Sequence, residues 1–554
     1  MFAKAWILAG TLALAALACS SPQQAPSPSG GGAVAPAQET PKPGGRLTLD
    51  IAFEPNNWDT TKANRRQIYY TAHTMGRLLR FKSGEGIGYE DTVLEPEMAE
   101  KWAIAPDGKS FTFNLRKGVK FQNLPPVNGR EFTSADVKFT LEYVSRTGEV
   151  ARNKDKLGLS NESWLVAGLS GVTTPDPYTA VVQFGDPFVP FINYVSICFM
   201  SILPREIYDA DGDFTKKRIG TGPFYLDTTA SQSGSRLVYK KHPGYWEAGK
   251  PYLDEVYQLI IPDEVTQRAA FAAKQLDIIT ERISSQVLAE IEKSNPQAVK
   301  FPITSPGPGY IWLNSQPGKP MADVRIRRAF SLAMDRDELI KTFSGGKGLW
   351  AFMGALPGAF TQDEIKKVVR YDVTEAKKLL ADAGYPNGLN LELLNPGKAY
   401  GDWYNDAMEL IQAQEKKAGI NVTIRNIESA EVAARGKSGD YQIAAGGTLG
   451  LFADIDSNVF GAFHPSSGNN SGHVDDPKLT AMIEAQRKEA DPKKRQEALR
   501  AIGLHINENV WGQVPMFRMP TAYFWHPYVK GYYPNFANAG TAYTPDMTTT
   551  WISK

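Results

Sequence analysis

Hydrophobic and polar residues follow short, distinct patterns along the chain. Residues 46–53 alternate apolar with polar positions, which predicts a strand. Thr133 or Ser134, with Asp136 in the following turn and apolar residues at helical spacing, predicts a capped helix. A further helix is predicted over 323–339. These patterns indicate a chain that mixes helices with strands.

The clearest pattern is a helix, a glycine and a strand, repeated twice in succession. Asp372 caps the first helix, Gly384 ends it, and leucines alternate with other residues over 389–393. The second copy has a helix over 406–418, a glycine and a strand over 420–424. This order favours an α/β layer with parallel strands.

The amino-terminal residues are typical of an export signal followed by a tether. Lys4 is the only charge before an apolar run over 5–18, which is too short to span a bilayer. Residues 20–43 are rich in Ser, Pro and Gly and are expected to be a flexible tether with a root-mean-square span of roughly 27 Å. Cys19, between the two, resembles the cysteine of bacterial lipoproteins, which becomes a lipid-bearing amino terminus. The small residues before Cys19 also fit ordinary signal cleavage, and both alternatives place the folded part outside the cytoplasm.

The composition excludes some classes of partner. The 554 residues include 61 basic and 60 acidic ones, so nucleic acid is not an expected partner. The length predicts two or three domains. Cys198, the only cysteine after Cys19, lies in an apolar stretch and is expected to be a buried, unreactive thiol.

A search for catalytic motifs gives little. The chain has no Gly-x-Ser-x-Gly, Cys-x-x-Cys or His-Glu-x-x-His motif. His464 and His473 flank a loop, but without tight ligand spacing they are read as surface histidines and not as metal ligands. We therefore expect no metal, no cofactor and no enzyme activity, with an exported hydrolase as the distant alternative.

A series of short motifs runs in fixed order through the chain. They are LEPEMAEKW (94–102), PDGK (106–109), FTFNLR (111–116), VKF (119–121), FTSADV (132–137), GTGPF (220–224), GYW (244–246), LD (276–277), DVRIRRA (323–329), MDR (334–336), AGYP (383–386) and VKG (529–531). In this order they resemble the family 5 extracellular solute-binding proteins, the dipeptide-, oligopeptide- and nickel-binding components of bacterial ABC importers. Most of these residues are expected to build the scaffold, so they identify the family and not the solute.

The resemblance implies an α/β fold of the periplasmic-binding-protein type, with two lobes, a hinge and a smaller extra α+β domain. The implied divisions are a signal peptide (1–18), a tether (19–43), a first lobe in three parts (44–79, 212–303 and 509–554), an extra domain (80–211) and a second lobe (304–508).

The resemblance also implies candidate solute contacts. In peptide-binding relatives, the carboxylate of a Gly-Trp-x-x-Asp segment holds the α-ammonium of the ligand; here that segment runs from Gly450 to Asp454, with Leu451 in place of Trp. Asp454 is equally able to cap a loop or helix. Tyr310 falls where such relatives line the site, with core packing as its alternative.

Two further candidates are weaker. Arg66 lies in the stretch that pairs with the peptide main chain in oligopeptide binders and would favour a carboxylate, or it is simply solvated. Trp403 would stack on a sugar or side chain, or anchor packing.

Together these expectations describe a lipid-anchored monomer in the periplasm or on the outer face of the cell membrane. It would capture a short peptide by lobe closure and deliver it to ABC permease subunits in the membrane. An oligosaccharide or a metal chelate is the alternative solute.

Overall fold

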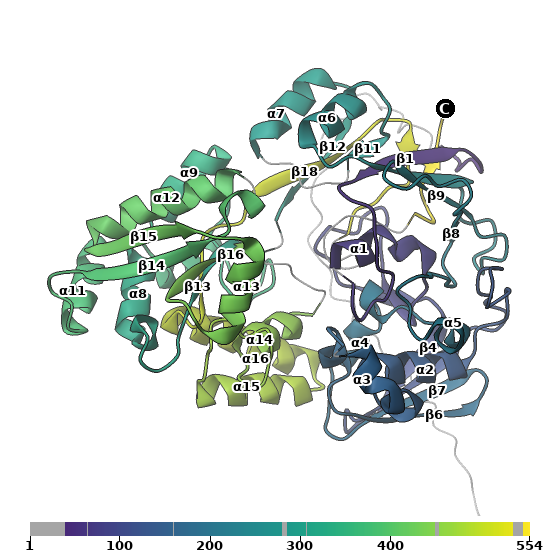
Figure 1. The fold of residues 1–554 in the computed structure, drawn as a ribbon, viewed down its shortest axis with the longest axis horizontal. Coiled ribbons are helices and arrows are strands. Elements are labelled where there is room, and N and C mark those ends of the chain that lie inside the picture. The colour runs from purple at the N-terminus through teal and green to yellow at the C-terminus, as the bar shows by residue number, and fades with distance from the viewer. Residues whose placement is uncertain are drawn as a thin grey trace, which may run out of the picture. The chain divides into compact units, whose positions relative to one another are not determined.

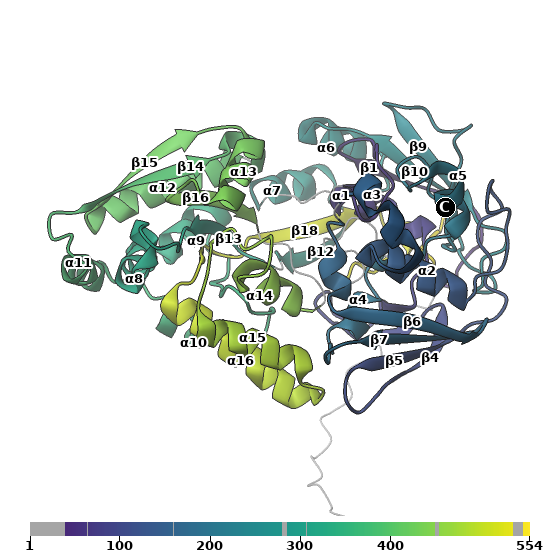
Figure 2. The same cartoon turned by 60° about the horizontal axis from the view of Figure 1, so that its bottom comes forward.

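The computed structural model describes residues 39–63, 65–158, 160–279, 285–305, 307–400, 402–448, 454–535 and 547–554. Residues Pro41–Lys554 group together as one unit. In its described part, three sheets have four or more strands each, and helices lie against them (Figures 1 and 2).

The first sheet is mixed and has the strand order β12-β18-β11-β1-β10-β9-β8. Its strands are β1 (Arg46–Ile51), β8 (Phe224–Leu226), β9 (Arg236–Lys241), β10 (Glu255–Ile260), β11 (Ile278–Ile279), β12 (Val299–Thr304) and β18 (Pro520–Trp525). The predicted strand over 46–53 is confirmed as β1, which runs parallel to β10 and β11. Helices α1 (Arg65–Tyr70), α6 (Glu264–Ala272) and α7 (Ser285–Ser294) belong to this part, which we call the first lobe.

The second sheet has the order β15-β14-β16-β13-β17. Its strands are β13 (Gly309–Leu313), β14 (Leu389–Asn395), β15 (Ile420–Asn426), β16 (Ile443–Thr448) and β17 (Gln513–Pro515). Strands β14 and β15 pair in parallel, as the repeated helix–glycine–strand pattern predicted. Strand β16 is parallel to β14, whereas β13 is antiparallel to both β16 and β17.

Helices surround the second sheet, and together they form the second lobe (Figure 1). They are α8 (Val324–Ala333), α9 (Arg336–Ser344), α10 (Gln362–Val368), α11 (Val373–Asp382), α12 (Asp402–Lys417), α13 (Ser429–Ser438), α14 (Asp456–Phe463), α15 (Pro477–Lys488) and α16 (Pro492–Asn509). The predicted single helix over 323–339 is wrong. Asp323 caps α8 as expected, but a second cap at Asp335, whose carboxylate accepts from the backbone N–H of Glu338, starts α9.

The third sheet belongs to the predicted extra domain. It has the order β4-β5-β7-β6, with β4 (Ala99–Ile104), β5 (Ser110–Leu115), β6 (Leu169–Asp176) and β7 (Thr179–Phe184). The short strands β2 (Leu79–Phe81) and β3 (Leu94–Pro96) pair separately. The predicted capped helix is confirmed as α2 (Ser134–Ser145), with Thr133 and Asp136 forming a capping box. Helices α3 (Lys154–Leu157), α4 (Phe191–Tyr194) and α5 (Arg205–Asp211) complete this part.

Two chain segments connect the first and second sheets. One leads from β12 to β13 and the other from β17 to β18, and they run side by side. The backbone N–H of Ser305 donates to the carbonyl of Met519 at 2.8 Å, and that of Gly309 donates to Phe517 at 3.2 Å. Arg518 strengthens this pairing through a 2.6 Å hydrogen bond from Nε to the Ser305 carbonyl. The two lobes are therefore joined by a hydrogen-bonded pair of crossovers.

One predicted domain boundary needs correction. The last part of the first lobe was expected to begin at 509, but β17 pairs with β13 in the second sheet. The chain returns to the first sheet only at β18, because residues beyond α16 must first complete the edge of the second sheet.

Cys198 is buried, as predicted, and burial raises the pKa of its thiol to about 12. A thiol with so high a pKa carries little thiolate at neutral pH and is a weak nucleophile. Separately, none of the helices in the described ranges is long and apolar enough to cross a bilayer.

Candidate functional site

The parallel strands of the second lobe end at one edge of its sheet. Strands β14 and β16 finish there, and the antiparallel β13 begins there, since Gly309 lies opposite Thr448. Ligands of open α/β sheets bind outside the carboxyl ends of the strands. We call this the carboxyl edge of the second sheet.

Tyr310 lies at the carboxyl edge, in a register that pairs it with Gly447. Its carbonyl accepts a 2.6 Å hydrogen bond from the hydroxyl of Tyr404, and that hydroxyl accepts one from the backbone N–H of Gly447 at 3.0 Å. Burial raises the pKa of both phenols, so they are neutral at physiological pH. The backbone around Tyr310 is thus fixed by a buried hydroxyl from α12.

Two adjacent glycines allow aromatic rings to approach the end of β16. A Cβ on Gly446 would lie 2.2 Å from the ring of Tyr310, and a Cβ on Gly447 would lie 2.9 Å from the ring of Tyr400. Gly447 also has a φ of +83°, which favours glycine. Only glycine leaves room for the two rings, so Gly446 and Gly447 determine the positions of the Tyr310 and Tyr400 rings.

Trp403 joins the same aromatic group. It is half-buried, and its ring lies 5.3 Å from Tyr404 and 6.0 Å from Phe517, measured between centroids. A Cβ on Gly309 would lie 3.5 Å from Trp403. Tyr310 and Trp403 are therefore brought together at the carboxyl edge, beside the crossover that contains Phe517.

Asp454 is buried and fully engaged. Arg495 donates two hydrogen bonds to its carboxylate, at 2.7 and 2.9 Å, and the side-chain amide of Asn193 donates a third at 2.7 Å. Burial alone raises the pKa of Asp454, but the Arg495 guanidinium outweighs it and leaves the pKa below its ordinary value. The Asp454 carboxylate also accepts from the backbone N–H of Asp456, the first residue of α14, at 2.9 Å.

The neighbouring Asp456 extends this network toward the extra domain. Its carboxylate accepts from the hydroxyl of Tyr194 at 2.7 Å and from Nε of Arg487 at 3.2 Å. Asn193 and Tyr194 both belong to α4, so two adjacent residues of the extra domain bind two carboxylates of the second lobe. The guanidinium of Arg487 also lies over the ring of Phe188, 4.6 Å from its centroid. Two carboxylates of the second lobe thus hold adjacent side chains of α4.

The remaining predicted contacts are placed only in part. Arg66 belongs to α1, but its side chain, like Gly450 and Cys19, lies outside what the structure describes. The described residues contain no group of three or more His, Cys, Asp or Glu side chains arranged for a metal ion.

Sequence reasoning missed Tyr400, Tyr404 and Arg495. The Gly446-Gly447 pair inside a strand was an available signal, because glycines in strands often mark close approach by another group. Arg495 gave no signal, since it lies 41 residues from its partner Asp454 on a different helix.

Comparison with known proteins identifies the family of the chain. Residues 93–470, more than half of the chain, match the bacterial extracellular solute-binding proteins, family 5 (middle region). The chain is 29% identical over 437 residues to the dipeptide-binding protein of Escherichia coli K12, covering 76% of this chain and 79% of that protein. It is 28% identical over 421 residues to heme-binding protein A of Haemophilus influenzae, covering 74% of each.

A solved structure shows the same fold. The periplasmic binding protein DppA of Helicobacter pylori, in complex with the peptide STSA, superimposes with a TM-score of 0.76 at 24% identity, covering 93% of this chain and 99% of that one. The two-lobe α/β fold of periplasmic binding proteins is therefore established here. With the family match over 93–470, the chain belongs to the family 5 extracellular solute-binding proteins.

Proposed function

We propose that this protein captures a short peptide at the carboxyl edge of the second sheet and delivers it, unaltered, to an ABC permease. The observation that carries the proposal is the aromatic group at that edge, where Tyr310, Tyr400 and Trp403 stand beside the paired crossovers. Peptide-binding relatives and a peptide-bound structural neighbour support the choice of solute. Solute binding would favour one arrangement of the two lobes, and the permease would recognise the protein in that arrangement.

Within this proposal, Tyr310, Trp403, Arg66, Gly450 and Asp454 are the candidate contacts. Contact between Asp454 and a peptide would require the loss of an existing hydrogen bond, because the Asp454 carboxylate already accepts from Arg495 and Asn193. A peptide ammonium would have to take the place of the Asn193 amide, exchanging a neutral donor for a charged one. Charge-assisted hydrogen bonds are roughly twice as strong as neutral ones, so the exchange is physically reasonable.

One observation favours a second candidate, a solute without a free ammonium. The bidentate Arg495 already neutralises Asp454, so the carboxylate offers less attraction to a second cation. The transport role would be the same, with an oligosaccharide or a metal chelate as cargo.

A thermal-shift screen distinguishes these candidates. Pools of di- and tripeptides, the same peptides acetylated at the amino terminus, oligosaccharides and metal chelates are added to the purified protein. A solute at one hundred times its Kd adds about 2.7 kcal/mol of stability. Peptides are expected to raise the melting temperature, and mass spectrometry is expected to recover them intact. A shift with sugars or chelates but not with peptides would contradict the peptide proposal, and recovery of cleaved solute would contradict simple transport.

The role of Asp454 is tested with Asp454→Asn at a temperature where the variant is folded. If Asp454 holds the ammonium, affinity for free-amino peptides falls at least roughly ten-fold while acetylated peptides bind unchanged. Equal effects on both peptides would assign Asp454 to the scaffold.

We also propose that Cys19 carries lipid and anchors the protein at the outer face of the cell membrane. In the sequence, an apolar run typical of an export signal, a cysteine, and a stretch rich in Ser, Pro and Gly support this proposal. Cys19→Ser is expected to move the protein from the membrane fraction to the soluble fraction. An intact mass without added lipid would contradict the anchor.

A further inference from the structure

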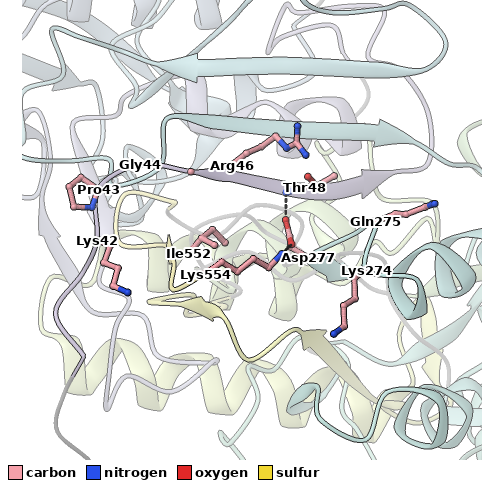
Figure 3. Close-up of a pocket in the computed structure, with 11 residues that line it drawn as sticks. Lys42, Pro43, Gly44, Arg46, Thr48, Lys274, Gln275, Asp277, Ile552 and Lys554 are labelled. Atoms are coloured by element: carbon pink, nitrogen blue, oxygen red, sulfur yellow. Dashed lines mark hydrogen bonds and ion pairs between the residues drawn. The ribbon is translucent and has the colours of Figure 1, made fainter.

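A cavity of about 530 Å³ lies at the amino end of β1, where the folded unit begins (Figure 3). Its lining includes Lys42, Lys274 and Lys554, together with the carboxylate of Asp277. β1 belongs to the first sheet, and no residue that lines the cavity belongs to the second sheet. The cavity is therefore separate from the carboxyl edge, where a solute is proposed to bind.

The side chains that line the cavity carry an excess of positive charge. Asp277 is its one acidic side chain, and it is occupied by hydrogen bonds from the backbone N–H of Thr48 at 2.7 Å and from the Tyr528 hydroxyl at 2.8 Å. Lys554 stands 3.6 Å from the same carboxylate. Lys42 and Lys274 are exposed and have no ion-pair partner among the described residues. Arg46 also lines the cavity, but its side chain lies on the other side of β1 in Figure 3 and stacks on Tyr257.

Lys274 occupies a backbone position that favours glycine. It follows α6 with a φ of +58°, and its N–H donates to Phe271 while the N–H of Gln275 donates to Ala270. This hydrogen-bond pair is the Schellman ending of a helix, whose left-handed residue is usually glycine. A lysine in a backbone position that favours glycine strains the backbone. We take this strain as an indication that the lysine side chain has a function. In Figure 3 the Lys274 side chain points away from β1, and the residue is exposed.

The chain preceding the cavity limits which anion it meets. Lys42, Pro43 and Gly44 line the cavity, so the tether enters the folded unit here. A coil of the length from Cys19 to Lys42 has a root-mean-square span of about 27 Å, so a lipid on Cys19 would hold this end of the folded unit near the bilayer. Near a bilayer, the unpaired Lys42 and Lys274 would meet phosphodiester headgroups at high local concentration.

From these observations we propose that the cavity binds the phosphate of an anionic phospholipid headgroup at the membrane surface. The proposal rests on the lipid anchor proposed above, which supplies proximity. Lysines near an anionic membrane each contribute roughly five-fold to binding, and the contribution weakens as salt rises. Headgroup binding at the cavity would use no residue of the carboxyl edge of the second sheet.

Vesicle co-sedimentation tests the proposal with the exported Cys19→Ser chain, which lacks lipid. Vesicles of phosphatidylcholine alone are compared with vesicles that also contain phosphatidylglycerol, and inorganic phosphate is titrated separately. We expect binding only with phosphatidylglycerol, weakened by salt. Lys274→Gly and Lys42→Gln are each expected to reduce it about five-fold. Lys378→Gln, which removes an exposed lysine of α11, is expected to leave it unchanged.

Lys274→Gly also separates binding from folding. Glycine suits the left-handed position, so the variant is expected to melt at the same or a higher temperature while it loses vesicle binding. Equal binding to both vesicle types, or equal losses in Lys274→Gly and Lys378→Gln, would overturn the proposal. Saturable binding of inorganic phosphate without binding to phosphatidylglycerol vesicles would overturn the headgroup as its source. Because the assay contains no solute and no permease, its failure is independent of the transport function.

Discussion

Arg495 donates two hydrogen bonds to Asp454, at 2.7 and 2.9 Å, and so ties α16 to the segment that leads into α14. The Asp454 side chain is 2% exposed and that of Arg495 is 13% exposed. Removing one partner of a buried pair leaves the other charge without compensation, which costs far more than the pair itself contributes.

Asp454→Asn is therefore expected to lower the free energy of unfolding by roughly 3 kcal/mol. Urea titration at neutral pH measures the loss. Asp440→Asn is the matched control, because Asp440 pairs with Arg435 at 3.0 Å but is 73% exposed. The control is expected to change stability by less than about 1 kcal/mol. Similar losses in the two variants would show that the buried pair contributes no more to the free energy of unfolding than the exposed pair.

The same pair predicts a loss of stability in acid. The pKa of Asp454 is lowered in the folded state, so the unfolded chain takes up a proton at higher pH than the folded one. The stabilisation is complete above the unfolded pKa of about 4 and disappears as pH falls through the folded pKa. Wild type is expected to lose stability over this interval, whereas Asp454→Asn loses less. Parallel pH profiles of the two proteins would contradict this assignment.

Glu415 predicts the opposite dependence on pH. It is fully buried in α12, neither carboxylate oxygen has a hydrogen-bond partner within the described residues, and burial raises its pKa well above the ordinary value despite Arg336. As pH rises past the unfolded pKa of about 4.3, the unfolded chain releases this proton while the folded chain retains it, so stability falls.

Glu415→Gln removes this dependence and is expected to gain stability relative to wild type as pH rises from 5 to 8. Denaturant midpoints at the two pH values measure the change. Glu409→Gln, on an exposed position of the same helix, is the control. A wild-type advantage that grows with pH would show that Glu415 is ionised in the folded protein.

Gly446→Ala tests the aromatic group at the carboxyl edge. The added methyl would lie 2.2 Å from the ring of Tyr310, which must move. Overpacking of this kind costs about 1–3 kcal/mol, and displacement of Tyr310 is expected to weaken solute binding measured by calorimetry. Gly461→Ala, in α14 with nothing within 4 Å of the added methyl, is expected to preserve affinity. Unchanged solute affinity in folded Gly446→Ala would remove Tyr310 from the candidate contacts.

Arg518→Met tests the link between the crossovers. Arg518 donates to the carbonyl of Ser305 at 2.6 Å and also to the partly exposed Glu90. Loss of these bonds is expected to destabilise the protein by about 1–3 kcal/mol and to change the difference in X-ray scattering between solute-free and solute-bound protein. Glu90→Gln removes only the exposed ion pair and is expected to have an effect below about 1 kcal/mol. Identical behaviour of both variants would show that the crossover bond is unimportant.

The sequence predicted local structure best where signals were local. Thr133, Asp323 and Asp372 cap helices as expected, and the glycines between helix and strand led to the parallel pairing of β14 with β15. The break between α8 and α9 was missed because apolar spacing continues past Met334 while the cap at Asp335 interrupts the backbone. Strand β17 was assigned to the wrong lobe, because strand pairing depends on distant residues that no local pattern reveals.

The candidate site was harder to predict for the same reason. The family resemblance indicated Tyr310 and Asp454, but the side chains that determine their environment come from other elements. Tyr404 reaches Tyr310 from α12, and Asn193 reaches Asp454 across 261 residues of sequence. Whether Asp454 faces a solute or a guanidinium depends on Arg495, which only the folded chain brings near.

The hydrogen bond between Ser305 and Met519 has a consequence for how such proteins diversify. The whole second lobe lies between these two residues, so its two ends meet at one point of the first lobe. A continuous stretch with adjoining ends can be exchanged for that of a relative in one genetic step, without new junctions elsewhere. A chimera joined at this junction would combine the solute specificity of a relative with the remaining domains of this protein. The transported solute would then change while the permease stays the same.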